Sequence, residues 1–381
     1  MQKKLFVTGS SGVLGEPIVS QFEGKELITL YHHNKPSYRD VESFSGDISK
    51  PQFGLDNQAY DKLADSIKGI IHSAALTNFI QKKKLHRTNV QGTAEILKLA
   101  RRADVPIFHI STAFVHPVFE KPDGDNLYVE SKLAAEKLLQ ESGHPVSIIR
   151  PSIVTGDSTT GYMPTFQGFH ETMCSFLSES MRVAVANDQG YIDIIPRDVV
   201  GKLIAEIIKQ NIVNEEFWLS TGENAVSIKA LIQCAQEVSV EMTGKKVRVP
   251  WMLSPTIYRK VIRPLLFRFV PRGVIQDIRR LEQLEGYFGT HKKLPSSLDE
   301  LDKKWNIRAE YSEMDSLRRN VQWLFNTYII TDDAADPSIV AAKNSDKDTG
   351  YSRRSAYLSR LSYLLCGDST GGHGPGGRGD H

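Results

Sequence analysis

Cysteine is scarce in this sequence, and long apolar runs are missing from it. The 381 residues include only three cysteines, Cys174, Cys234 and Cys366, which are far apart and lack the CxxC spacing of a redox pair. Scattered cysteines in odd number do not make a disulfide framework, so a reducing compartment is expected. No apolar stretch approaches the roughly 20 residues that cross a bilayer, and the first one, residues 5–7, ends too soon for a signal peptide. We therefore expect a cytoplasmic protein.

An excess of one charge is also missing. The chain has 47 basic and 45 acidic residues, which gives a formal net charge of +2. This balance argues against a commitment of the whole chain to nucleic acid or to an anionic membrane, and no nucleic-acid partner is expected. Any contact with a charged partner must come from a local patch.

Up to about residue 150, short apolar runs alternate with stretches of helical period. This βαβ rhythm predicts an α/β fold of the Rossmann type, with a doubly wound parallel sheet. The pattern from residue 88 to 103 is typical of an amphipathic crossover helix. The expected strands are residues 5–7, 27–30, 69–72, 107–110 and 146–149, followed later by a helix at 199–209 and a strand at 217–219.

A glycine-rich turn, TGSSGVLG, joins the first expected strand to the first helix. Glycine permits a tight turn and a close approach of the backbone to a pyrophosphate, and the helix N-terminus adds N–H donors. Pro17, early in this helix, removes one backbone donor. The residues predicted to hold a dinucleotide here are Thr8, Gly9, Ser11, Gly12, Val13, Leu14 and Gly15.

These signals divide the chain into three regions. Residues 1–155 are predicted to form the dinucleotide-binding domain, which later elements rejoin around residues 190–225. Residues 156–330 are assigned mainly to a smaller C-terminal substrate-binding region, rich in loops as far as about residue 190. Residues 331–381 are rich in Asp, Ser, Lys and Gly and are predicted to be a disordered tail.

The end of the second expected strand distinguishes the two nicotinamide cofactors. An acid there would bind the ribose hydroxyls of NAD, whereas basic residues accept the 2′-phosphate of NADP. Residues 30–35 contain no carboxylate but do contain His32 and Lys35. NADPH is therefore the predicted cofactor, with a solvated polar loop as the alternative interpretation.

Tyr128 and Lys132 begin a run of good helix formers, and their spacing of four places both side chains on one helix face. A nearby ammonium favours the phenolate, which predicts a lowered pKa for Tyr128 and proton exchange with a substrate oxygen. This spacing also occurs by chance on solvated helices. Here it follows Ser111 and Thr112, which end an expected parallel strand where a hydroxyl would face a ligand.

Several motifs of this chain occur in an order that resembles the extended short-chain dehydrogenase/reductases. Two stretches, GDISKPQFGL and RPSIVTGDSTTG, are similar to the thioester reductase and fatty acyl reductase branch of that class. IPRDVV resembles a later motif of the branch, with Arg197 where a small apolar residue is more usual. The ordered set is TGSSGVLG, GDI (46–48), HSAA (72–75), NVQGT (89–93), STAFV (111–115) and YVESK (128–132).

The resemblance implies a role for each matching residue. Tyr128 would donate the proton, Lys132 would assist it and reach the cofactor ribose, and Thr112 would orient the substrate carbonyl. Ser111 would pack the strand end. The other implied cofactor contacts are Asp47 and Ile48 at the adenine, with Ala74, Ala75, Asn89, Pro151 and Ser152 along the dinucleotide.

The implied activity is the NADPH-dependent reduction of an acyl thioester, on coenzyme A or a carrier protein, to an aldehyde, with a second reduction to the alcohol left open. An NAD(P)-dependent epimerase, dehydratase or hydroxysteroid-type dehydrogenase would use the same three residues. A non-enzymatic cofactor sensor or scaffold is disfavoured because the Thr-Tyr-Lys set is intact. Apolar and aromatic residues at 160–176 would line an acyl pocket or pack a core. No metal site is predicted.

One local patch departs from the charge balance. From Arg259 to Arg280 the sequence has seven basic residues and one acid, interleaved with apolar residues and broken by Pro264 and Pro271. It would be a solvated face, a dock for an acidic acyl or peptidyl carrier protein or for coenzyme phosphates, or, less favoured, a contact with a membrane surface.

Overall fold

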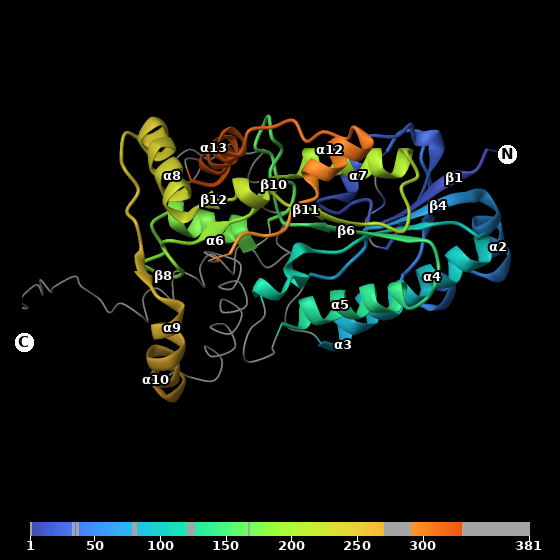
Figure 1. The fold of residues 1–381 in the computed structure, drawn as a ribbon, viewed down its shortest axis with the longest axis horizontal. Coiled ribbons are helices and arrows are strands. Elements are labelled where there is room, and N and C mark those ends of the chain that lie inside the picture. The colour runs from blue at the N-terminus through green and yellow to red at the C-terminus, as the bar shows by residue number, and fades with distance from the viewer. Residues whose placement is uncertain are drawn as a thin grey trace, which may run out of the picture.

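The computed structural model describes residues 2–32, 35, 38–77, 82–119, 126–166, 168–269, 290 and 292–329. Their centre is a seven-stranded parallel sheet in the order β11-β6-β5-β4-β1-β2-β3 (Figure 1). This is the order of a doubly wound Rossmann sheet, in which the chain turns back between β1 and β4. The strands are β1 (Lys4–Thr8), β2 (Leu27–Tyr31), β3 (Glu42–Ser45), β4 (Ile67–His72), β5 (Ile107–Ile110), β6 (Val146–Pro151) and β11 (Glu216–Leu219).

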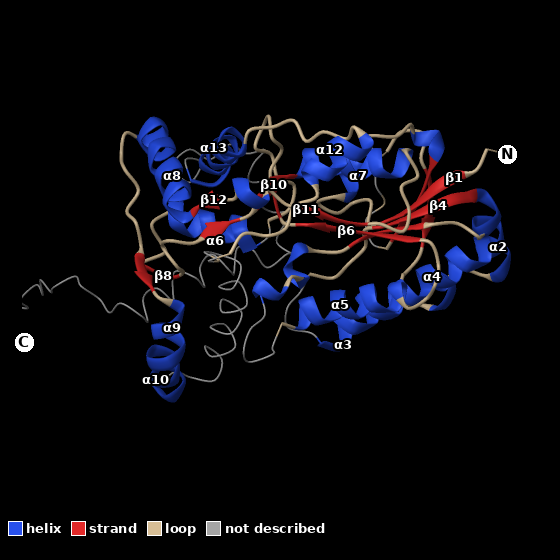
Figure 2. Ribbon diagram, viewed as in Figure 1, coloured by secondary structure: helices blue, strands red, loops and turns tan. Residues whose placement is uncertain are grey.

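The central strands are apolar throughout because both faces of the sheet are covered. Helices α2, α4 and α5 lie on one face, and α1, α7 and α12 lie on the other (Figure 2). Strand β3, at the sheet edge, is only partly buried and accordingly has the polar sequence ESFS. The helix bounds are α1 (Gly15–Val19), α2 (Asn57–Ser66), α3 (Lys82–Leu85), α4 (Gly92–Ala103), α5 (Leu127–Gln140), α7 (Arg197–Lys209) and α12 (Leu298–Trp305).

The structure confirms the predicted Rossmann sheet and its five early strands. The expected crossover helix is in two parts, a π-helical turn at His86–Gln91 and then α4. The later predicted helix is α7, and the later predicted strand is β11, which pairs with β6 at the sheet edge. Helix α12 also packs on the sheet, through Leu301.

A second, smaller core lies beyond the sheet and is built by α6, α8 and α13. The stretch up to residue 190 is largely loop, as expected, but it also contains α6 and the short strands β7 and β8. Phe169, Met173 and Phe176 of α6 are buried in this core, in keeping with the core-packing alternative for residues 160–176. The elements are α6 (Gly168–Leu177), α8 (Ile228–Thr243), α13 (Glu313–Leu324), β7 (Ile153–Thr155), β8 (Val183–Val185), β9 (Tyr191–Ile192), β10 (Ile194–Pro196), β12 (Val226–Ser227) and β13 (Trp251–Leu253).

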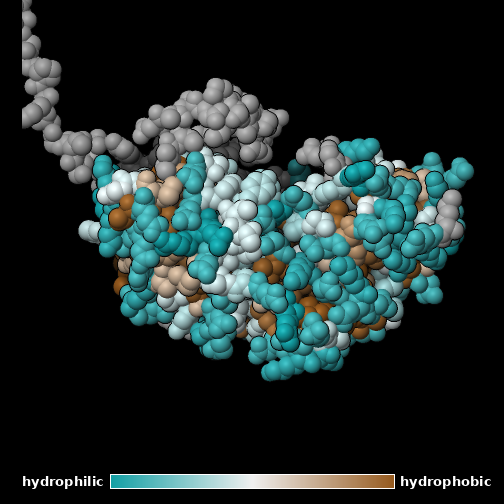
Figure 3. Space-filling view, turned by 90° about the horizontal axis from the view of Figure 1, so that it is seen from above, coloured by the Kyte–Doolittle hydropathy of each residue, from teal (hydrophilic) through white to brown (hydrophobic). Residues whose placement is uncertain are grey.

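Helices α9 (Pro255–Ile257) and α10 (Arg263–Phe269) project from this smaller region (Figure 1). The basic patch beyond residue 269 and the predicted tail, 331–381, lie outside the described residues. None of the helices described is long and apolar enough to span a membrane. The face seen in Figure 3 is mostly hydrophilic, with apolar side chains in small groups. Cys174 and Cys234 are buried.

Candidate active site

The glycine-rich turn after β1 has the compact form that a dinucleotide site requires. Gly9 has φ of +74°, and the Gly12 N–H donates to the Gly9 carbonyl over 3.0 Å. A Cβ at Gly9 would lie 2.5 Å from the Ala74 nitrogen, and one at Gly15 would lie 2.0 Å from the Gly9 oxygen. No side chain fits at either position, so the turn packs directly against the segment that follows β4. The backbone is thereby free to approach a pyrophosphate at the N-terminus of α1.

A buried hydrogen-bond chain connects this turn to α4. Thr8 Oγ1 lies 2.8 Å from His72 Nδ1, and His72 Nε2 lies 3.1 Å from Thr93 Oγ1. Burial, with a contribution from Lys132, lowers the pKa of His72 to about 3, so the imidazole is neutral at physiological pH. A second buried imidazole, His109 of β5, packs 5.2 Å from the first, between ring centroids. These hydrogen bonds fix the ends of β1 and β4. The crevice expected to hold the cofactor lies between these two strands.

Asn89 links the cofactor side of the site to α5. Its Oδ1 accepts the Leu76 N–H over 2.8 Å, and its Nδ2 donates to the Leu76 carbonyl over 3.0 Å and to Ser131 Oγ over 2.9 Å. Ser131 Oγ in turn donates to the carbonyl of Tyr128 over 2.7 Å. The side chain of Asn89 therefore aligns the segment after β4 with the helix that presents Tyr128.

Thr112 and Tyr128 meet at the carboxyl end of β5. Both side chains are buried, 4% and 9% exposed, and a hydrogen bond joins their hydroxyls. Burial raises the pKa of Tyr128 to about 12, and the bond to Thr112 only partly opposes it. The prediction of a lowered pKa is wrong in direction for this structure, because desolvation of the phenolate dominates. A phenol that keeps its proton is suited to donate it, as a reduction requires.

Lys132 lies one helical turn beyond Tyr128 and is 2% exposed. Its Nζ donates to the carbonyl of Ile110, the last residue of β5, over 2.7 Å. Burial lowers the pKa of Lys132 to about 8, while the Glu136 carboxylate one turn further along opposes this shift. The ammonium is therefore still present at neutral pH, within a dry site.

Sequence reasoning missed the buried ion pair that supports Lys132. Arg150 donates to the two carboxylate oxygens of Glu136 over 2.8 to 3.2 Å, and its Nη1 lies 2.8 Å from the carboxylate of Glu216. Ser111 Oγ donates to Glu136, which explains why Thr112, and not Ser111, is the hydroxyl that reaches Tyr128. One feature of the sequence could have indicated a partner for Lys132: Glu136 is four residues further along and therefore lies on the same helix face.

The adenine end of the predicted site is more open. Asp47 Oδ1 accepts both the N–H and the hydroxyl of Ser49, and these bonds keep the pKa of Asp47 lowered even though burial acts to raise it. Asp47 Oδ2 lies 3.8 Å from Nε2 of the exposed His32. Lys35 is exposed, and its neighbours His33 and Asn34 lie outside the described residues. The NADP preference stays a prediction.

Three further predicted cofactor residues, Ile48, Pro151 and Ser152, have defined positions in the structure. The Ile48 side chain packs over Gly92, where a Cβ would lie 3.1 Å from Ile48 Cδ1. Pro151 ends β6, and the following Ser152 is buried and donates its N–H to the Leu219 carbonyl over 3.0 Å. Within the described part of the chain, no group of His, Cys, Asp or Glu side chains is arranged to hold a metal ion.

Residues 27–204 match the family of NAD-binding domains described as male sterility protein. This part of the chain is similar to male sterility-type domains. The match is to an NAD(P)-binding, thioester reductase-like domain, which confirms the predicted resemblance and is consistent with an oxidoreductase.

The curated relatives of the male sterility-type domain are much longer than this chain. Fusarin C synthetase of Gibberella fujikuroi is 26% identical over 259 residues, which are 59% of this chain and 6% of that protein. Glycine betaine reductase of Emericella nidulans is 28% identical over 230 residues, which are 55% of this chain and 18% of that protein. The chain thus spans a small part of each.

Solved structures share the fold at low identity. The terminal R domain of the myxalamid PKS-NRPS pathway has a TM-score of 0.67 at 20% identity, over 85% of this chain and 91% of that one. A thiolation-reductase di-domain of an archaeal non-ribosomal peptide synthetase has a TM-score of 0.62 at 18% identity, over 86% and 76%. UDP-glucose 4-epimerase of Thermotoga maritima has a TM-score of 0.56 at 15% identity, over 85% and 99%.

Proposed function

We propose that this protein reduces an acyl thioester to an aldehyde with NADPH, and that Tyr128 is the proton donor. The observation that carries the proposal is the pair of buried hydroxyls of Thr112 and Tyr128, with the buried ammonium of Lys132 one turn beyond Tyr128 on α5. The thioester reductase-like family of the domain supports the choice of substrate class.

When bound, NADPH would provide the hydride for the thioester carbonyl carbon, and the residues of this chain would handle the charge and the proton. The two hydroxyls stabilise the negative charge that develops on the carbonyl oxygen, because they are preorganised donors in a site with little water. Tyr128 then gives its proton to this oxygen. When the carbon–sulfur bond breaks, the hydroxyl proton returns to Tyr128, and the products are an aldehyde and a thiolate that takes a proton from solvent.

The positive charge of Lys132 favours the transfer of the proton from Tyr128 to the substrate oxygen, because it stabilises the phenolate that forms. Its ammonium is held by the Ile110 carbonyl and by the field of Glu136, so the proton remains on it at neutral pH. Thr8, Ser11, Val13, Leu14 and the glycines of the turn would hold the pyrophosphate, and Asp47 and Ile48 would meet the adenine. His32 and Lys35 would accept the 2′-phosphate, since both are exposed at the end of β2.

The thioester donor is proposed to be an acidic carrier protein or coenzyme A. A solved structure similar to this chain contains a thiolation domain joined to the reductase. Lys260 and Arg268, in the projecting α9–α10 segment, are exposed cations that could steer such a donor. This basic segment is therefore the proposed docking surface.

The test is a panel of substrates with NADPH and with NADH. Acyl thioesters on coenzyme A and on a carrier protein are compared with nucleotide sugars and hydroxysteroids, and the products are identified. An aldehyde from a thioester supports the proposal. The second candidate, an epimerase or dehydrogenase, rests on the shared fold with UDP-glucose 4-epimerase, and turnover of a nucleotide sugar alone would favour it.

A further inference from the structure

Two residues that the motifs do not explain, Pro17 and Arg197, come together at the phosphate-binding turn. Within α1 and its entry, Glu16 donates its N–H to the Gly12 carbonyl over 3.3 Å and Ile18 to the Leu14 carbonyl over 3.1 Å. The carbonyl between them, that of Val13, would accept from residue 17. Pro17 has no N–H, so α1 itself offers no donor to Val13.

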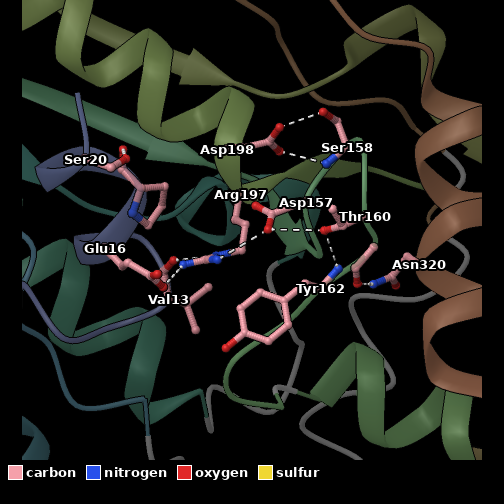
Figure 4. Close-up of polar contacts among 12 residues, drawn as sticks. Val13, Glu16, Ser20, Asp157, Ser158, Thr160, Tyr162, Arg197, Asp198 and Asn320 are labelled. Carbon is pink, nitrogen blue, oxygen red and sulfur yellow. Dashed lines mark hydrogen bonds and ion pairs between the residues drawn. The ribbon is translucent and has the colours of Figure 1, made fainter. Parts of the chain in front are cut away.

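Arg197 provides that donor from a helix 184 positions away in sequence: its Nε donates to the Val13 carbonyl over 3.2 Å. The residue is 3% exposed, so water does not readily replace this bond. Arg197 Nη2 lies 2.5 Å from the Glu16 carboxylate, which balances its charge. Figure 4 shows the guanidinium between Val13 and Glu16 on one side and Asp157 on the other.

The packing of α7 on α1 sets this geometry. A Cβ at Gly201 would lie 2.6 Å from Pro17 Cβ, so the two helices approach closely where one residue is glycine and the other is proline. Gly201 is one helical turn beyond Arg197, which begins α7. The same contact that accommodates the proline ring therefore brings the guanidinium to the carbonyl that the ring leaves without a donor.

The other side of Arg197 faces the loop that follows β7. Asp157 Oδ2 lies 3.7 Å from Arg197 Nη1, and the Tyr162 ring lies 5.8 Å from its guanidinium carbon. This loop is fixed from the smaller region by Asn320 of α13, whose Nδ2 donates to the Gly161 carbonyl over 3.0 Å. Arg197 thus stands between the cofactor turn and a loop anchored on the second core.

We propose that Arg197 is a positioning residue for the cofactor. It replaces the N–H that Pro17 lacks, and it holds Val13 so that the glycine turn keeps the form that binds a pyrophosphate. The inference concerns dinucleotide binding alone and does not depend on thioester chemistry. A purely structural role would change the stability of the protein without changing its affinity for NADPH.

The test is a double-mutant cycle at Pro17 and Arg197, read as the NADPH dissociation constant by calorimetry. Arg197→Met is expected to weaken binding on the order of tenfold, which equals about 1.4 kcal/mol. Pro17→Ala alone is expected to bind like the wild type. In the double variant the backbone N–H restored at position 17 can donate to Val13, so most of the affinity returns.

The matched control is Glu16→Gln, which removes the carboxylate next to Arg197 but leaves the bond to Val13. Its dissociation constant is expected to stay within about twofold of wild type, because Glu16 is half exposed. In steady-state assays, Arg197→Met should raise the KM for NADPH and leave kcat nearly unchanged.

Two outcomes would overturn the inference. One is an NADPH dissociation constant that is unchanged in Arg197→Met. The other is a loss of affinity in the double variant as large as that in Arg197→Met alone. If Arg197→Met alone does not fold, the double variant decides. A soluble double variant that binds NADPH supports the inference, and one that is equally unfolded contradicts it.

Discussion

Removing the charge of Glu136 should destabilise the protein through its buried partner. The change Glu136→Gln keeps the shape of the side chain but leaves Arg150, whose side chain is 6% exposed, without its buried carboxylate partner. It also leaves one amide oxygen, in place of two carboxylate oxygens, to accept from Ser111 and Arg150. Two contacts of Arg150 remain in this variant. Its guanidinium still lies 2.8 Å from the Glu216 carboxylate and 4.6 Å from the centre of the Trp218 ring.

The expected loss follows from these contacts. Breaking a buried ion pair from one side typically costs about 3–5 kcal/mol, and the remaining Glu216 contact places this case near the lower end, at about 3 kcal/mol. Removing both partners, in Glu136→Leu with Arg150→Met, should cost less than the single change, because the buried guanidinium is then removed together with its carboxylate. The free energy of unfolding is measured by urea titration.

The control is Asp302→Asn, whose partner Arg308 forms an exposed pair 2.8 Å long. Its effect should be much smaller than that of Glu136→Gln, because solvent screens an exposed pair. If Glu136→Gln lost no more than this control, or if the double variant were the less stable one, the reasoning about the buried pair would be refuted.

Three other predictions concern activity. Tyr128→Phe should lower turnover about 10²–10⁴-fold while the NADPH dissociation constant stays unchanged, since the phenol acts on the substrate oxygen; near-normal turnover would exclude Tyr128 as the acid. Because burial places the pKa of Lys132 near 8, kcat/KM should hold below that pH and fall as the ammonium is lost above it, and a profile flat to pH 10 would contradict this role. The double change Lys260→Glu with Arg268→Glu should raise the KM for a carrier-bound thioester, and the increase should be larger at low salt. The KM for a short uncharged thioester should stay unchanged. The control is Lys303→Glu, which changes an exposed lysine on α12.

Most of the Rossmann sheet could be predicted from the sequence because its strands are short apolar runs between turn residues. Those runs are apolar since both sheet faces are covered, and the glycine spacing of the first turn has one dominant structural meaning. The second core was not predicted. Helix α6 was taken for a loop because its aromatic residues suggested a pocket, and their burial depends on α8 and α13, which lie 50 to 150 residues further along.

The candidate site was predicted in its residues but not in its electrostatics. Spacing alone suggested that Lys132 lowers the pKa of Tyr128, whereas the depth of burial, which depends on the whole fold, raises it. The partners Glu136 and Arg150 come from a helix and a strand that pack only in three dimensions. Pro17 and Arg197 each looked unusual in the sequence, and their connection required the contact between α1 and α7.

The most direct test of the central claim follows one atom from the cofactor to the product. The protein is incubated with NADPH carrying deuterium at the transferred position and with an acyl thioester, and the product is analysed by mass spectrometry. The account predicts an aldehyde, or an alcohol derived from it, with deuterium on the former carbonyl carbon, and no such product from Tyr128→Phe on the same timescale. Intact thioester after prolonged incubation, together with deuterium in a sugar or steroid substrate, would contradict it.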